Sequence, residues 1–201
     1  MIIENERIES KRSESKAIES KGIESKGIES KSLSWILRCP RISDATELSK
    51  LRMQIDGETE YLDREAGEGF LAPEDFEKLI YEDSIAERTL FLVAEVDGKI
   101  VGFTRCEGNR LNRFKHKAEF GICVLLEYCG AGIGKVLMEH ILMWADSIGI
   151  EKITLNVVQT NTKAIQLYKK FGFVEEGLLI KDRIHKDGLY YNTLVMGRFR
   201  N

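Results

Sequence analysis

The sequence has few of the features that mark several large classes of protein. Its 201 residues include three histidines and four cysteines, and the cysteines show no CxxC spacing, which argues against a zinc site or a disulfide framework. No apolar stretch approaches the ~20 residues that cross a bilayer. The net charge of −3 provides no electrostatic basis for binding nucleic acid. We therefore expect no metal, no membrane partner and no nucleic-acid partner.

The first residues also lack a targeting signal. The opening "MIIENERIES" has neither the basic start nor the apolar run of a signal peptide. Free thiols are typical of a reducing compartment, so we expect a cytoplasmic protein. With 43% hydrophobic and 31% charged residues, the composition is that of a globular domain.

A tandem pentapeptide, "IESKR SESKA IESKG IESKG IESKS", occupies residues 8–32. A five-residue period turns by about 140° per repeat on a helix, so Ile18, Ile23 and Ile28 never form one face. Acidic and basic residues are balanced in this stretch. We expect residues 1–32 to be a disordered, solvated tail and residues 33–201 to form the folded domain.

Hydrophobic periodicity in the folded part predicts one α/β domain. Strands are expected at 34–39, 90–96, 99–106, 116–125, 151–158, 177–185 and 189–199, and helices at 44–55, 73–82, 136–148 and 162–171. Asp44 and Glu47 have the spacing of a capping box at the first helix. Asp97-Gly98 is a strong hairpin signal between two strands, and Asp187-Gly188 predicts a second hairpin turn.

A glycine-rich loop, "CGAGIGK" (residues 129–135), lies between a predicted strand and a predicted helix. Free N–H groups and the dipole at a helix N-terminus favour an anion there. A Walker loop would need Ser or Thr where Val136 stands, and glycine where Cys129 stands. A dinucleotide fingerprint would need its third glycine one residue later than Gly134, and no second βαβ half is evident. Both nucleotide-binding patterns fail on spacing.

The loop and a second segment, "NTKAIQLYKKFGF" (residues 161–173), together resemble the two signatures of the GNAT superfamily of acetyl-CoA-dependent N-acetyltransferases. The first signature is (Gln/Arg)-x-x-Gly-x-(Gly/Ala), and the second is N-x-x-A-x-x-L-Y-x-x-x-G-F. The resemblance implies a mixed, mostly antiparallel central sheet that is flanked by helices. It also implies that the sheet is splayed beside a pyrophosphate-binding loop.

The same resemblance assigns residues to acetyl-CoA. It implies backbone contacts to the pantetheine arm at the strand end, pyrophosphate contacts in the loop, and further contacts from the second signature. These residues are Val124, Leu125, Cys129, Gly130, Ala131, Gly132, Ile133, Gly134, Lys135, Asn161, Lys163 and Tyr168. Asn161 could equally be a helix cap, and Lys163 and Lys169 could be solvated lysines. Cys129 and Leu126 depart from the family pattern, and we expect Cys129 to weaken coenzyme A binding rather than abolish it.

The chemistry implied is direct attack of a primary amine on the thioester. Tyr168 matches the tyrosine that protonates the departing thiolate, and a backbone N–H near Val124 would meet the oxyanion. Glu119 matches a position where relatives carry a base, often acting through water, and His116 is the alternative. An acyl-cysteine at Cys129 is not expected, because the loop faces pyrophosphate.

The sequence says less about the identity of the acceptor than about that of the donor. Residues 57–87 carry eleven acidic residues but two basic ones, which suits a cationic acceptor or, equally, an ordinary solvated surface. Strand alternation lets one of Tyr190 and Tyr191 point into the acceptor pocket. We expect a small-molecule amine or a protein N-terminus as acceptor, with a homodimer left open. The alternative is a non-catalytic acyl-CoA-binding or regulatory protein on the same fold, which would need neither Tyr168 nor a base.

Overall fold

The computed structural model describes residues 18–19 and 35–200. The disordered tail expected for residues 1–32 thus lies, apart from Ile18–Glu19, outside the described residues. The elements follow in the order β1 (Ile18–Glu19), β2 (Trp35–Arg38), η1 (Ile42–Asp44), α2 (Ala45–Glu58), α3 (Pro73–Ile85), β3 (Thr89–Val96), β4 (Lys99–Gly108), β5 (Lys117–Val124), η2 (Leu126–Tyr128), α4 (Ile133–Ser147), β6 (Lys152–Val158), α5 (Thr162–Lys170), β7 (Val174–Ile184) and β8 (Tyr190–Phe199).

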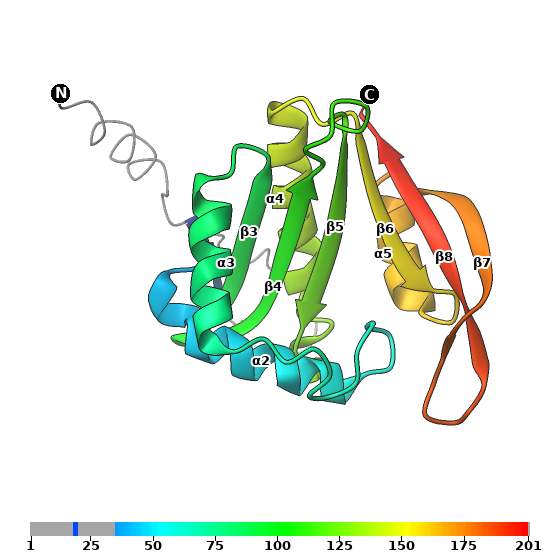
Figure 1. Cartoon of the computed structure of the whole chain (residues 1–201), viewed down its shortest axis with the longest axis horizontal. Helices are drawn as coiled ribbons and strands as arrows, with labels where there is room; N and C mark the ends of the chain where they lie inside the picture. Colours follow the sequence, from blue (N-terminus) through cyan, green and yellow to red (C-terminus); the bar gives the residue numbers. More distant parts are fainter. Residues whose placement is uncertain (1–17, 20–34, 201) are drawn as a thin grey trace, which may run out of the picture.

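One sheet runs through the molecule in the strand order β1-β2-β3-β4-β5-β6-β8-β7. Among the described strands, β5 and β6 pair in parallel and every other neighbouring pair is antiparallel. Helices α2 and α3 cover one face, while α4 and α5 lie behind the other (Figure 1). The predicted mixed, mostly antiparallel α/β fold is confirmed.

The sheet opens between β5 and β6, as the family resemblance implied. Their pairing is limited to three positions, which run from Lys117↔Lys152 to Glu119↔Thr154. Beyond Glu119 the two strands diverge (Figure 1). The open part of β5 leads through η2 into the glycine loop and then into α4, so the gap lies beside the loop that was predicted to hold pyrophosphate.

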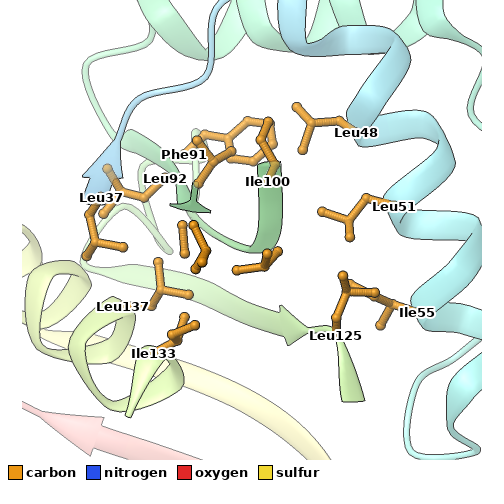
Figure 2. Close-up of a cluster of buried hydrophobic side chains, with 14 of the residues drawn as sticks. Leu37, Leu48, Leu51, Ile55, Phe91, Leu92, Ile100, Leu125, Ile133 and Leu137 are labelled. Atoms are coloured by element: carbon orange, nitrogen blue, oxygen red, sulfur yellow. The ribbon is translucent and has the colours of Figure 1, made fainter. Parts of the chain in front are cut away.

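The largest core cluster fixes α2 against the sheet. Leu48, Leu51 and Ile55 of α2 are buried and point toward Ile100 and Leu125 (Figure 2). Their three- and four-residue spacing is that of a helix face, as the sequence predicts. Burial of each such side chain stabilises the fold by about 1.5–3 kcal/mol. This packing places the C-terminal end of α2 next to the end of β5.

The predicted capping box is wrong, because both side chains have partners elsewhere. The Asp44 carboxylate accepts hydrogen bonds from the Arg38 guanidinium at 2.6 Å and from the Arg41 N–H at 2.6 Å. Burial alone would raise the pKa of Asp44, but these hydrogen bonds outweigh it and lower that pKa. Glu47 accepts a hydrogen bond from the Ile100 N–H at 2.7 Å. The two carboxylates therefore tie α2 to the sheet instead of capping it.

The predicted turns and helix ends are in place. Asp97 (φ 50°) and Gly98 (φ 79°) form the β3–β4 turn with positive φ at both positions. Gly149 and Gly172, with φ of 74° and 83°, follow the ends of α4 and α5. Within the part of the chain that the structure describes, no helix is both long and apolar enough to cross a membrane.

Candidate functional site

The glycine loop (residues 129–135) turns the chain from η2 into α4 and leaves its amides open. Gly130 and Gly132 have φ of 90° and 89°, a region that favours glycine, whereas Gly134 lies in the first turn of α4. Within residues 35–200, no acceptor pairs with the N–H groups of Gly130, Gly132 or the first three residues of α4. These groups surround a helix N-terminus and can bind a phosphate or pyrophosphate.

The end of β5 presents one of its two predicted backbone positions to the gap. The Leu125 N–H is bonded to the Val101 carbonyl of β4 at 2.9 Å, and the Leu125 side chain is fully buried. The Leu125 carbonyl accepts the Tyr128 N–H at 2.9 Å, so the expectation that Leu125 offers a free backbone group is wrong. Because amides alternate in direction along a strand, the Val124 N–H points toward the side of β6, where pairing has ended. Val124 is thus the position that can meet an amide-rich arm or an oxyanion.

The start of α5 lies near the glycine loop. Asn161 caps α5 by accepting a hydrogen bond from the Ala164 N–H at 3.3 Å, so its predicted capping role is confirmed. Lys163 is close enough to Cys129 to influence the pKa of its thiol, which partial burial raises. Lys163 is exposed and has no ion pair among the described residues, which leaves it available to a phosphate.

The other two candidate lysines have partners. Lys169 pairs with Glu175 at 2.7 Å, and Lys135 pairs with Glu139 one turn along α4 at 3.5 Å. Both pairs are exposed, so they hold their lysines weakly. Cys129 itself is exposed, and its Sγ donates to the Val124 carbonyl at 3.7 Å. Its side chain thus contacts the strand end rather than the far side of the loop.

Tyr168 is the buried polar residue of α5. Its side chain packs edge-on to Phe120 of β5, with 6.4 Å between ring centroids, and against Phe173 at 5.9 Å. Burial raises the pKa of Tyr168 to about 12, and the nearby Cys123 thiol adds to the effect. The hydroxyl has no hydrogen-bond partner among residues 35–200. A neutral phenol beside the open end of β5 is suited to donating a proton.

The two candidate bases lie at different ends of the β5–β6 pairing. Glu119 is exposed and sits opposite Thr154, at the last paired position before the gap, and its neighbour Phe120 contacts Tyr168. His116 precedes β5, and its carbonyl accepts the Glu151 and Lys152 N–H groups at the closed end. The geometry therefore favours Glu119 over His116 as a group that can reach the gap.

An acidic cleft opens between the α2–α3 segment (residues 59–72) and the end of β7. Its volume is about 380 Å³. Carboxylates outnumber basic groups in the lining. The lining residues are Asp56, Thr59, Glu60, Leu62, Asp63, Arg64, Glu65, Glu68, Asp182, Arg183, Ile184, His185 and Lys186. Four of the acids in the acid-rich sequence stretch thus line this cleft.

Contacts between distant parts of the chain build this cleft. Arg183 donates to the Leu62 carbonyl at 3.2 Å and to the Asp63 carboxylate at 2.9 Å. Glu60 accepts the Lys186 N–H at 3.0 Å. These partners are about 120 residues apart, so the sequence pattern did not indicate them. The sequence did offer one hint of this wall of the cleft, namely the charged and polar residues that gather between Lys181 and Lys186, at the exposed end of β7 and in the turn after it.

Cys123 of β5 interacts electrostatically with a residue of the acidic cleft and with Tyr168. Burial raises the pKa of the Cys123 thiol to about 12, and Asp56 of the cleft contributes to that rise. The same thiol contributes to the raised pKa of Tyr168. Tyr191 stacks on His185 beside the cleft, while Tyr190 is 62% exposed. Tyr191 therefore packs beside the cleft, whereas Tyr190 faces solvent.

Among the described residues, no group of three or more His, Cys, Asp or Glu side chains could hold a metal ion. All four cysteines are free thiols. The arrangement can therefore bind an anion at the loop, donate a proton from Tyr168 and accept cations in the cleft.

Comparison with known proteins points to one family. The model of the acetyltransferase (GNAT) family matches residues 56–173, which is more than half of the chain. L-amino acid N-acetyltransferase AaaT of Escherichia coli is 32% identical over 124 residues, covering 60% of this chain and 76% of that protein. Spermidine N(1)-acetyltransferase of Vibrio cholerae is 35% identical over 98 residues, which cover 48% of this chain and 55% of that enzyme.

A solved structure matches nearly the whole described domain. The acetyltransferase of the GNAT family from Streptococcus pneumoniae superposes with a TM-score of 0.80 at 26% sequence identity. The match covers 83% of this chain and 100% of that one. The splayed sheet and the glycine loop thus belong to a known architecture.

Proposed function

The chain belongs to the acetyltransferase (GNAT) family and is an acetyl-CoA-dependent acetyltransferase, and we propose that it acetylates a cationic primary amine by direct attack. The observation that carries the choice of acceptor is the acidic cleft beside the β5–β6 gap. A cleft lined mainly by carboxylates attracts cations and raises their local concentration. Acetylation of small amines is also what the names of two relatives describe.

Acetyl-CoA fits the donor side of the site. The unpaired amides of the glycine loop would hold the pyrophosphate, and the Val124 N–H would meet the pantetheine arm or the thioester oxygen. The positive φ of Gly130 and Gly132 opens the loop, and a Cβ built at either position meets no atom within 4 Å. Lys163 would add charge near the phosphates.

The reaction needs a base and a proton donor, and no enzyme nucleophile. Glu119, directly or through water, takes a proton from the acceptor ammonium and leaves a neutral amine. The amine nitrogen attacks the thioester carbon, the C–N bond forms, and the C–S bond breaks. Tyr168 gives its proton to the coenzyme A thiolate as it leaves. The nitrogen gives up its second proton to solvent, and solvent returns a proton to the Tyr168 phenolate. The products are the amide, the free thiol and one proton, which Glu119 returns to solvent.

A panel of amines tests this function. Thiol release from acetyl-CoA would be measured with amines of equal length that carry a terminal ammonium, hydroxyl, carboxylate or methyl group. We expect kcat/KM to be highest for the ammonium series, and mass spectrometry to show one added acetyl group. If acetyl-CoA binds and no amine is acetylated, the non-catalytic alternative stands. If the carboxylate series is preferred, the cationic acceptor is wrong while acetyl transfer remains.

A further inference from the structure

One buried polar group has no role in the reaction described above. The His185 side chain, in the turn after β7, is 7% exposed. Its Nε2 is shielded from solvent and has no hydrogen-bond partner among residues 35–200. Leaving a buried polar atom without a hydrogen bond destabilises a fold. Because the residue His185 lines the acidic cleft, a ligand bound there can supply the missing hydrogen bond.

The imidazole of His185 is held on both sides. Its ring stacks on Tyr191 with 3.9 Å between centroids and 16° between planes, and the Tyr191 hydroxyl donates to Asp187 at 2.6 Å. Its Nδ1 lies 3.6 Å from the Glu60 carboxylate, which is itself fixed by the Lys186 N–H. A carboxylate beside Nδ1 favours the tautomer with the proton on Nδ1. Nε2 is then a hydrogen-bond acceptor.

The charge of the cleft indicates which kind of hydrogen-bond donor would pair with Nε2. The basic groups of the lining are largely neutralised, because Arg64 pairs with Asp56 and Arg183 pairs with Asp63. Glu65, Glu68 and Asp182 have no ion pair among the described residues, so unbalanced negative charge remains. A donor that carries positive charge satisfies both features at once, and a protonated amine is such a donor.

We propose that His185 is a specificity-determining residue whose Nε2 accepts a hydrogen bond from a second, protonated amine of the acceptor. The inference rests on the proposed function, since it assumes that the reacting amine enters by the same cleft. It narrows the acceptor to amines with two cationic groups, one at the thioester and one held between His185 and the free carboxylates. Glu60 is a positioning residue that sets the tautomer.

Turnover of a matched pair of amines tests the proposal. Butan-1-amine and 1,4-diaminobutane have the same carbon chain and differ by one ammonium group. We expect the wild type to prefer the diamine beyond the factor of two that its second reactive group supplies. His185→Phe keeps a ring on Tyr191 and removes Nε2. It should reduce the preference about tenfold, since a hydrogen bond to a charged group is lost.

The controls separate recognition from folding. His185→Gln retains an acceptor oxygen and should restore part of the preference. His140→Gln changes a histidine of α4, whose Nδ1 contacts the Val136 carbonyl, and should leave both amines unaffected. If His185→Phe slows both amines equally, or leaves their ratio unchanged, His185 does not select the acceptor.

A spectroscopic measurement tests the proposal without a variant and without turnover. The chain has three histidines, so ¹⁵N labelling of histidine gives a small set of imidazole signals. We expect His185 to be the Nδ1–H tautomer, with an Nε2 signal that shifts with 1,4-diaminobutane and not with butan-1-amine. An Nε2–H tautomer, or no shift at saturation, would overturn the proposal even if acetyl transfer is observed. A shift without acetyl transfer would instead contradict the proposed function alone.

Discussion

The proposed donor side and the proposed acceptor side of this site are built in different ways. On the donor side, a local strand–loop–helix unit exposes backbone amides of the glycine loop, and a second local unit supplies Asn161 and Tyr168. On the acceptor side, Arg183 and Glu60 join segments about 120 residues apart through side-chain contacts. The donor side depends on backbone geometry, whereas the acceptor side depends on charge pairs and can vary with the surface sequence.

The family match covers the two sides of the site unequally. It spans residues 56–173, which include the glycine loop and Tyr168 but end before β7. One wall of the acidic cleft, from Asp182 to Lys186, lies outside that match. The two relatives are named for different acceptors, an L-amino acid and spermidine.

The largest effect is expected when the proposed proton donor is removed. Tyr168→Phe should lower kcat by about 10²–10⁴-fold, the range for loss of general acid catalysis, while the Kd for acetyl-CoA changes little. Because burial raises the pKa of Tyr168 to about 12, the phenol stays protonated as pH rises. The wild-type kcat should therefore show no loss from this group until about pH 11. Steady-state kinetics and calorimetry measure both quantities.

Tyr81→Phe is the matched control, since Tyr81 of α3 is 59% exposed and far from the donor motifs in the sequence. It should leave kcat unchanged. If Tyr168→Phe raises KM for acetyl-CoA and leaves kcat intact, Tyr168 only packs in the core and the proton comes from elsewhere.

The next effect tests the backbone geometry of the donor side. Gly132→Ala places a Cβ on a residue with φ of 89°, and Gly98→Ala does the same at φ of 79° in the β3–β4 turn. Each should lose about 1–2 kcal/mol of stability, because L side chains are strained in this region. Gly132→Ala alone should also weaken coenzyme A binding, about tenfold or more, since its backbone borders the anion site.

Thermal unfolding and titration calorimetry with coenzyme A distinguish the two outcomes. Equal binding by both variants would show that strain at Gly132 does not reach the anion site. The amides of the loop would then be insufficient to explain donor affinity, and the contrast between the two sides would weaken.

The third-largest effect is expected when a side-chain contact that builds the acidic cleft is removed. The Arg183 side chain is 18% exposed and joins β7 to the α2–α3 segment, while the Arg198 side chain is 17% exposed and joins β8 to Asp146 of α4. Replacing either by alanine should cost about 1–3 kcal/mol of stability. Arg183→Ala should also raise the acceptor KM about tenfold, with the acetyl-CoA Kd unchanged. Arg198→Ala should change neither binding constant.

A rise in acceptor KM with both arginine variants would mean that general destabilisation, not the shape of the cleft, sets acceptor binding. A rise in the acetyl-CoA Kd with Arg183→Ala would mean that the two sides are coupled. Either result would contradict the division of the site into a backbone part and a side-chain part.

Sequence reasoning succeeded where structure follows from local chemistry. The Asp97-Gly98 turn, the Asn161 cap and the buried face of α2 depend on residues a few positions apart. It failed where a side chain had a competing distant partner. Asp44 matched a capping box but binds Arg38. Leu125 was expected to offer a free backbone group, but its N–H and its carbonyl are paired with Val101 and Tyr128.

The acceptor side shows the same limit on a larger scale. The excess of acids in residues 57–87 is visible in the sequence, but the facing wall is not. Arg183 and His185 lie on an exposed strand and turn with nothing in their spacing to indicate Asp63 or Glu60. Contacts of this kind depend on the fold bringing β7 to the α2–α3 segment, and local sequence patterns do not predict that approach.

The smallest effect is expected in a labelling experiment, which probes the donor side without changing any residue. Cys129 and Cys39 are exposed, whereas burial raises the pKa values of Cys106 and Cys123 to about 12 and keeps those thiols protonated. Alkylation at pH 8, followed by mass spectrometry of peptides, should label Cys129 and Cys39 first. Acetyl-CoA should slow the labelling of Cys129 several-fold and leave that of Cys39 unchanged. Because 1,4-diaminobutane is proposed to bind on the acceptor side, it should protect neither exposed thiol, and protection of Cys129 by the diamine would place the acceptor at the glycine loop.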